Sequence, residues 1–333
     1  MAEENAKGKV RKPADLIVDY RKSAIPGWVR EAIETHLAIE QEDAKGAGAL
    51  GFMSRALVIA SMPYKDPKAD SFTRQNGDFK LRILAGYEGG IPYGIYPRLL
   101  MSWVATEAVK TQNPWIELGD SLGGFLRDVL DLTSTGGKNG THTRVNEQMK
   151  RLFGSLITAQ YTGNLGSRGF MLKNVLIADE LELHEDETED TIWTPQPKEE
   201  AGSWRSKLKL SDSFFKELVE CPVPIDLRAY KALRGSPLAM DIYAWLTYRL
   251  SYTQKKTRPI PWEALMSQFG SNITANDIDQ ARRDFKRAFL AALQSVLIVY
   301  PKANIEVRDN GLILMPSPTH IAASFDGQQK KLF

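Results

Sequence analysis

Residues that could build a covalent or metal site are scarce in this sequence. Cys221 is the only cysteine among 333 residues, which excludes an intrachain disulfide and a zinc site made of paired cysteines. The four histidines show no His-x-His pair and no other metal-ligand spacing; they are His36, His142, His184 and His320. The stretch TGGKNG lacks the spacing of a Walker loop and its Gly-Lys-Ser/Thr ending. We therefore expect no metal, no cofactor, no catalytic residues and no enzymatic activity.

Long apolar runs are also missing. No stretch is long and apolar enough to cross a bilayer, and no charged-then-apolar signal follows Met1. The sequence therefore predicts a cytoplasmic protein that makes no membrane contact. A chain of 333 residues has room for two domains of ordinary size, each with its own core.

The formal net charge of +2 hides an uneven distribution of charge. Residues 179–200 contain ten acidic residues and one lysine, and the rest of the chain has 42 basic and 31 acidic residues. A surplus of positive charge outside one segment suits a polyanionic partner. We interpret the acidic segment as a solvated linker between two domains, in preference to a segment that screens DNA contact.

Residues 275–297 carry the clearest pattern in the chain. Apolar residues at steps of three and four predict a helix with one buried stripe, made of Ile278, Ala281, Phe285, Phe289, Ala292, Leu293 and Val296. The other face carries four cations with only Asp279 and Asp284 beside them; the cations are Arg282, Arg283, Lys286 and Arg287. Such a cluster is typical of a helix that contacts DNA, and also of a solvated surface helix.

A second copy of this pattern favours the DNA-binding interpretation. The segment MKRLFGSLI (149–157) aligns without a gap on FKRAFLAAL (285–293). A long helix, a short strand, a short helix and a glycine-containing turn precede each copy, with the long helices expected at 96–110 and 240–253. Five matching elements in the same order predict a duplicated unit. Helix, helix, recognition helix and then a hairpin is the order of a winged-helix domain.

The predicted fold class is α+β, with tandem duplicated winged-helix domains that are rich in helix, each with a small β-hairpin wing, and with an extra N-terminal helix and hairpin. The expected parts are a basic tail and helix (1–51), a first winged-helix domain with the extra hairpin (52–178), the acidic linker (179–203), a second winged-helix domain (204–318) and a flexible C-terminal tail (319–333). The extra hairpin should turn at Asn76-Gly77, and its sheet could serve as a dimer surface. Further strands are expected at 56–62, 204–210 and 297–300.

The candidate DNA-binding residues lie on the two basic helices, in the turn before the first basic helix, on the strand at 204–210 and in the second wing. Backbone amides at a helix start, helped by threonine and lysine, favour a phosphate. The candidates are Lys138, Thr141, Thr143, Arg144, Gln148, Lys150 and Arg151 in the first unit, and Arg205, Lys207, Arg282, Arg283, Lys286, Arg287 and Arg308 in the second.

Several motifs resemble the plasmid-encoded RepA-type replication initiator family. They are IPYGIYPRLLMSWVATEAVKT, LGDSLGGFLRDV, TGG-x-x-G-T-x-T-R-x-x-x-QMKRLF and SPLAMDIYAWLTYRLS, and the similarity covers residues 56–317. The resemblance implies an initiator that binds repeated sites, or iterons, in double-stranded plasmid origin DNA. It also implies that the protein helps the host initiator to open the duplex, recruits the replicative helicase, and exists as a homodimer that becomes monomeric to initiate.

Two other functions stay open. A sequence-specific transcriptional repressor, whose target can be its own gene, would use the same DNA-binding units. A DNA-nicking enzyme would need a metal-binding histidine pair or an arginine-rich catalytic set, and the sequence contains neither. We interpret Tyr93, Tyr96, Tyr243 and Tyr248 as core or interfacial aromatics on helices.

The last five residues suggest one more partner. Gln329, Leu332 and Phe333 resemble the Gln-x-x-Leu-Phe peptides by which bacterial replication proteins dock on the sliding clamp. Lys330 stands where leucine is usual, which should lower the affinity. The alternative is a terminal segment with no partner, because a short motif is a hypothesis until its context agrees.

Overall fold

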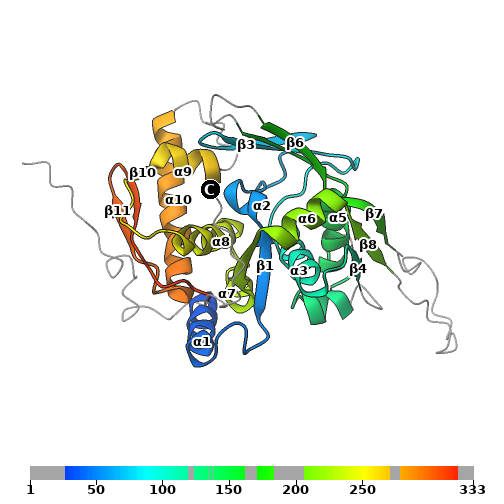
Figure 1. Ribbon diagram of the computed structural model, residues 1–333, viewed down its shortest axis with the longest axis horizontal. Helices are drawn as coiled ribbons and strands as arrows, with labels where there is room; N and C mark the ends of the chain where they lie inside the picture. The colour runs from blue at the N-terminus through cyan, green and yellow to red at the C-terminus, as the bar shows by residue number, and fades with distance from the viewer. Residues whose placement is uncertain are drawn as a thin grey trace, which may run out of the picture.

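The computed structural model describes residues 27–118, 124–133, 135–137, 139–161, 171–183, 206–270 and 278–321. Within these residues, helices and small antiparallel sheets are mixed, as the α+β fold class predicts (Figure 1). No helix of this part of the chain is long and apolar enough to cross a membrane.

The elements follow one another in an irregular order along the chain. The helices are α1 (Gly27–Gln41), α2 (Arg55–Ile59), α3 (Tyr96–Thr111), the π-helical turn η3 (Phe125–Val129), α5 (Thr141–Phe153), α6 (Asp212–Glu220), α7 (Leu227–Ala232), α8 (Pro237–Ser251), α9 (Trp262–Phe269) and α10 (Ile278–Val299). The strands are β1 (Leu50–Ser54), β2 (Ser71–Asn76), β3 (Phe79–Leu84), β4 (Trp115–Glu117), β5 (Leu156–Tyr161), β6 (Met171–Leu176), β7 (Ala178–Glu182), β8 (Lys207–Leu210), β9 (Pro222–Asp226), β10 (Ile260–Pro261), β11 (Ile305–Arg308) and β12 (Gly311–Leu314).

Helices α3 and α8 lie at the centre of the structure, and they confirm the long helices expected from the sequence. Both are buried on nearly all sides, which fits sequences that are apolar around most of the helix. Each has a proline in its first turn, Pro97 in α3 and Pro237 in α8. A proline there suits a helix start, because its fixed φ is helical and its missing N–H would have no partner.

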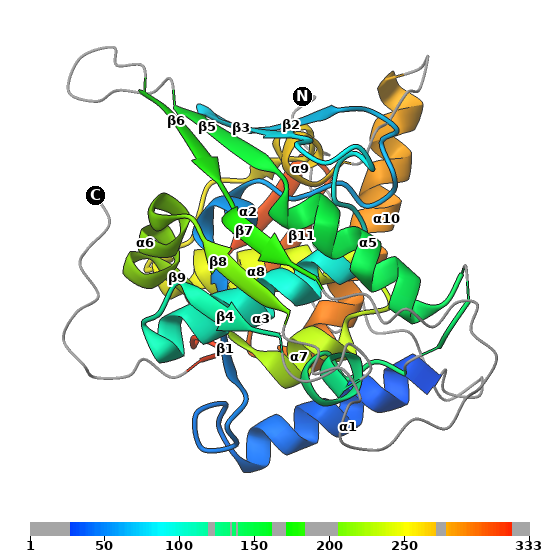
Figure 2. The same cartoon turned by 90° about the vertical axis from the view of Figure 1, so that its right-hand side faces the viewer.

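The expected hairpin is confirmed, with its two-residue loop at Gly77-Asp78, one residue later than the predicted Asn76-Gly77. It does not stand apart from the first repeated unit. Gly77 has φ +56°, a conformation that favours glycine in a two-residue turn. Strand β3 then pairs with β5, so that an antiparallel sheet forms in the order β2-β3-β5-β6. Figures 1 and 2 both show this sheet along the top of the molecule.

Two strand predictions are wrong. The segment expected to be a strand at 56–62 begins with helix α2, because the buried carboxylate of Glu217 accepts hydrogen bonds from the Ala56 N–H (3.3 Å) and the Ser54 hydroxyl (3.2 Å) at its start. The strand expected at 297–300 is the last turn of α10. Val299 continues the buried apolar stripe of that helix, so extending the helix buries this side chain against the core.

The two halves of the sequence are interleaved. Strand β8, which was expected to open the second unit, lies between β4 and β7 of the first half and pairs with both. Strand β1, near the beginning of the described chain, pairs with β9, and helix α1 packs against α7 and α10. Each half therefore completes part of its packing with segments from the other half.

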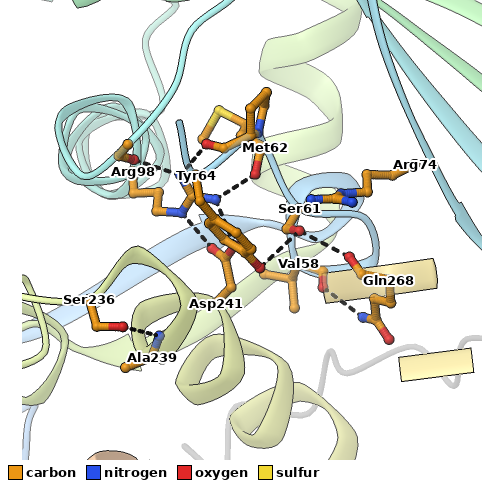
Figure 3. Close-up of polar contacts among 12 residues, drawn as sticks. Val58, Ser61, Met62, Tyr64, Arg74, Arg98, Ser236, Ala239, Asp241 and Gln268 are labelled. Carbon is orange, nitrogen blue, oxygen red and sulfur yellow. Dashed lines mark hydrogen bonds and ion pairs between the residues drawn. The ribbon is translucent and has the colours of Figure 1, made fainter. Parts of the chain in front are cut away.

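Arg98 of α3 is fully buried and joins the two halves (Figure 3). Its guanidinium donates to both carboxylate oxygens of Asp241 on α8, at 2.8 and 2.7 Å. Its other N–H groups donate to the carbonyl oxygens of Met62 (2.7 Å), Gly94 (2.6 Å) and Pro63 (3.2 Å). All five donors of this guanidinium are used, which a buried charge requires.

A second set of polar contacts links α2, the residues just after it and the top sheet to the end of α9. The Ser61 hydroxyl donates to the Gln268 carbonyl at 3.0 Å, and the Gln268 amide donates to the Val58 carbonyl at 3.5 Å. Arg74, on the inner face of β2, donates to the Gly270 carbonyl. Burial lowers the pKa of Arg74. The top sheet is thus tied to the C-terminal end of the helix that precedes α10.

Candidate nucleic-acid interface

Helix α10 is held in place by the apolar stripe that its sequence predicts. Ala281, Phe285, Phe289, Ala292, Leu293 and Val296 are all buried. Phe289 lies at the centre of an aromatic cluster, with its ring centroid 5.9 Å from that of Trp262 and 5.6 Å from that of Phe269. Ile278 is an exception to the predicted stripe, because it begins the helix and is 77% exposed. The packing fixes which face of α10 remains outside.

Two of the four α10 cations lie toward α9. Arg282 forms an ion pair with Glu263 at 2.7 Å, and the ammonium of Lys286 lies 4.9 Å from the centroid of the Trp262 ring. The indole N–H of Trp262 donates to the Arg308 carbonyl at 3.1 Å. These contacts connect α10, α9 and the β11–β12 hairpin in one surface.

The other two cations extend away from the helix packing. Arg287 has a side chain that is 82% exposed, and it contacts Asp284 one turn earlier at 2.9 Å. Arg283 is also exposed and donates to the Gln280 amide oxygen at 2.8 Å. Exposed pairs of this kind contribute little to stability, so an incoming phosphate can replace the partner at small cost.

The β11–β12 hairpin brings further cations beside this surface. Arg308 pairs with Glu306, and Lys256 pairs with the same carboxylate at 2.8 Å. The hydrogen bond from Lys256, with a further one from Arg308, lowers the pKa of the Glu306 carboxyl. Lys255 and Arg258 are exposed in the same segment. The sequence interpretation missed these residues, although KKTR, three cations in four residues, was a readable signal.

Helix α5 presents a smaller outward surface than its sequence suggests. Thr143 and Arg144 are exposed, and Lys150 is half-buried. The Thr143 hydroxyl donates to the Gly137 carbonyl at 3.0 Å, and the Thr135 hydroxyl oxygen accepts from the Thr141 N–H at 2.9 Å. The hydroxyls of Thr135 and Thr143 therefore stabilise the turn before the helix. Arg144 is the most accessible of the α5 cations.

Two α5 candidates lie inside the structure, and their expected place on the outer face is corrected here. Gln148 is 4% exposed, and its amide oxygen accepts from the Tyr93 N–H at 2.9 Å. Arg151 has a side chain that is 12% exposed, with ion pairs to Glu147 at 2.8 Å and Asp66 at 3.5 Å. The segment that contains Tyr93 covers this face of α5, an arrangement that helical periodicity cannot predict.

Lys207 lies in a different setting from the helix cations. It is exposed on β8, but its register partners on both sides are acidic, Glu117 on β4 and Glu182 on β7. Neighbouring carboxylates disfavour a phosphate at this point. The remaining candidates, Lys138, Arg205, Gln329, Leu332 and Phe333, lie outside the described residues.

The two basic helices lie toward the same side of the molecule in Figure 2. Figure 2 shows both α5 and α10 on its right-hand side, and Figure 1 separates them along the longest axis, with α3 and α8 between them. The residues that the structure describes contain no group of three His, Cys, Asp or Glu side chains that could hold a metal ion. The arrangement suits a long anionic partner that passes both helices.

Comparison with known proteins identifies a family. A family model described as plasmid encoded RepA protein matches residues 91–263, which is just over half of the chain. Among curated proteins, none matches. The crystal structure of SeMet derivatives of domains 2 and 3 of RctB is similar with a TM-score of 0.47, at 11% identity over 79% of this chain and 99% of that chain. A second crystal structure of RctB domains 2–3 (RctB-155-483) has a TM-score of 0.43, at 12% identity over 78% and 94%.

Proposed function

The chain belongs to the plasmid-encoded RepA protein family, a replication initiator family, and on that premise we propose that it initiates plasmid replication by binding repeated sites in the origin through two winged-helix units. The observation that carries the proposal is the surface of α10. A helix fixed by an aromatic cluster presents Arg283 and Arg287 outward, beside a hairpin that carries Arg308. A basic helix beside a wing is the arrangement with which winged-helix proteins contact a major groove and the adjacent phosphates.

The order of the elements supports the winged-helix assignment of the second unit. Helices α8, α9 and α10 alternate with strands so that β10 lies between α8 and α9, and β11 and β12 follow α10. The three strands form one antiparallel sheet in the order β10-β12-β11. In this arrangement β10 anchors the hairpin to the helical body, and the hairpin extends beside the recognition helix.

The first unit has the same order of elements with a different pairing. Helix α3, strand β4, the turn η3, helix α5 and strands β5 and β6 follow in sequence. Strand β4 pairs with β8 instead of with the β5–β6 hairpin, which joins β3. We propose that this unit is a modified winged helix in which α5 contacts DNA through Arg144 and the turn before the helix, on the side of the molecule where α10 also lies.

The decisive experiment is footprinting of the purified chain on the DNA that flanks its gene. Protection of tandem direct repeats beside an A·T-rich tract is the result expected of an initiator. Protection of a single promoter palindrome would instead indicate the repressor function. A measurement of permanganate reactivity in the A·T-rich tract, with and without the host initiator, then tests whether binding helps to open the duplex.

Further parts of the proposal concern the partners. We propose that the origin-bound chain acts without catalysis, works with the host initiator, and recruits the replicative helicase. A homodimer is the proposed resting form, and sedimentation of the free chain at several concentrations tests it. The sliding clamp is the proposed partner of Gln329, Leu332 and Phe333.

A further inference from the structure

The outer face of the top sheet has an unusual chemistry. Side chains alternate along its strands, so that Phe72, Leu81, Ile83 and Ile157 face the core. The polar residues of the opposite face are hydroxyls, amides and cations: Ser71, Thr73 and Gln75 on β2, Lys80 and Arg82 on β3, Thr158 and Gln160 on β5, and Asn174 on β6. None of these is a carboxylate. Leu84, Leu156 and Leu176 form an apolar row at one end of this face.

The strand register places each cation between two neutral polar residues. Arg82 lies between Thr73 and Thr158, and Lys80 lies between Gln75 and Gln160. A shallow hollow of about 280 Å³ opens among these side chains, lined by Ser71, Thr73, Lys80, Arg82, Thr158 and Gln160. Hydroxyl, amide, ammonium and guanidinium groups are the side-chain donors that contact phosphate oxygens.

Lys80 and Arg82 differ from Arg282 and Arg287 of α10 in having no acidic partner among the described residues. Arg282 and Arg287 each form an ion pair with a carboxylate. Among the described residues, neither Lys80 nor Arg82 has an ion pair with a carboxylate. Two adjacent cations without counter-charges repel each other, so a polar face built only for solubility would mix the signs. An anion on the hollow removes this repulsion.

The same face favours the backbone of duplex DNA over single strands. Single-stranded nucleic acid is typically held by aromatic side chains on which bases stack, and the lining of the hollow includes no aromatic residue. The sheet lies at the same end of the molecule as the N-terminal half of α10 in Figures 1 and 2, and β2 packs against α9. A duplex that contacts α10 can therefore reach the sheet with its flank.

We propose that the outer face of the β2-β3-β5-β6 sheet binds the phosphodiester backbone of duplex DNA that flanks the site contacted by α10, with Lys80 and Arg82 as the charged contacts. This inference rests on the proposed function, because α10 supplies the contact that places the flank. It adds a sequence-independent site to the two basic helices.

The test compares three full-length proteins: the wild type, K80Q/R82Q, and the control K45Q/K110Q, which removes two exposed cations from other surfaces. Fluorescence anisotropy measures the affinity of each for a minimal duplex with one footprinted repeat and for the same repeat with flanks. Circular dichroism melting shows that the variants remain folded. In K80Q/R82Q we expect the salt dependence, log K against log of salt concentration, to flatten by about two units on the flanked duplex. On the minimal duplex we expect little change.

Other results would overturn the inference. If K80Q/R82Q does not differ from the control on the flanked duplex, the sheet does not bind DNA. If the variant instead loses affinity only for a single-stranded oligonucleotide, the assignment to duplex is wrong. A change only in sedimentation would make this face an interface between copies of the chain. The proposed function is tested independently of this inference, and it is wrong if the wild type protects no repeat beside its gene.

Discussion

Arg98 on α3 donates two hydrogen bonds to the carboxylate of Asp241 on α8, a residue 143 positions later in the chain. The pair is buried, with 0% of the Arg98 side chain and 10% of the Asp241 side chain exposed. Three backbone carbonyls accept the remaining donors of Arg98. The contact therefore joins the central helix of each half and the segment before α3 at a single guanidinium.

The first prediction follows from that burial. The substitution Asp241→Ala leaves Arg98 charged and buried without its counter-ion, and we expect the free energy of unfolding to fall by about 3 to 5 kcal/mol. Urea denaturation followed by circular dichroism measures the change. Arg234→Ala is the control, because Arg234 pairs at the surface with Glu31 and Asp131 and should cost under about 1 kcal/mol. Equal losses in the two variants would contradict the central role of the buried pair.

The second prediction separates two arginines at equivalent positions of the repeat. Arg287 is exposed, and we expect R283A/R287A to flatten the salt dependence of binding to a footprinted repeat by about two units, with little effect on stability. Arg151 is clamped by Glu147 and Asp66 and lies 5.2 Å from the centroid of the Tyr93 ring. Arg151→Ala should instead lower the free energy of unfolding by about 1 to 3 kcal/mol.

The same two measurements, salt titration and urea denaturation, decide the assignment. If Arg151→Ala flattens the salt dependence of DNA binding and leaves the stability unchanged, Arg151 contacts DNA. Unchanged DNA affinity in R283A/R287A would show that α10 does not contact DNA through these two arginines.

The third prediction concerns pH. His320 lies against the Tyr300 ring with its Nδ1 atom 2.7 Å from the Tyr243 hydroxyl oxygen, and burial lowers the pKa of His320 from 6.5 to about 4. Asp226 opposes this shift of the pKa, whereas His36 and Arg228 add to it. Between pH 6.5 and about 4 the unfolded chain takes up a proton that the folded chain does not. The stability should therefore fall as the pH falls through this window, and this contribution is absent above it.

The size of this effect is about 3 kcal/mol, since each unit of pKa corresponds to about 1.4 kcal/mol. Urea denaturation at a series of pH values measures it in the wild type and in His320→Gln. The variant cannot take up the proton, so its stability should depend less on pH than that of the wild type across the window. Parallel curves for the two proteins would show that His320 is not the group responsible.

The fourth prediction concerns the C-terminal motif. Removal of Leu332 and Phe333 should abolish binding to the sliding clamp, because these two side chains would supply most of the apolar area buried in the clamp groove. Binding to the footprinted repeat should be unchanged. Titration of the clamp with the intact chain is the measurement, and the chain that lacks the two residues is its control. Absence of binding by the intact chain at high micromolar concentration would leave this segment without the proposed partner.

Local patterns in the sequence were enough to predict much of the secondary structure and the orientation of α10. A stripe of apolar residues at helical spacing can be buried in only one way, so the stripe centred on Phe285 and Phe289 also decides that Arg283 and Arg287 face outward. The hairpin that turns at Gly77 was predictable for a similar reason, since few residues other than glycine adopt the positive φ that the turn needs. The family resemblance was likewise carried by contiguous motifs.

Only the tertiary structure decided which repeated residues remain at the surface and how the halves join. Lys150-Arg151 and Lys286-Arg287 are the same dipeptide at matching positions of the repeat, yet the Arg151 side chain is 12% exposed and the Arg287 side chain is 82% exposed. The pairing of Arg98 with Asp241, and of β8 with β4, joins residues far apart in the chain, and no periodicity reports such contacts. Burial is a property of what packs over a residue, so a repeat in sequence determines the helix but not its surroundings.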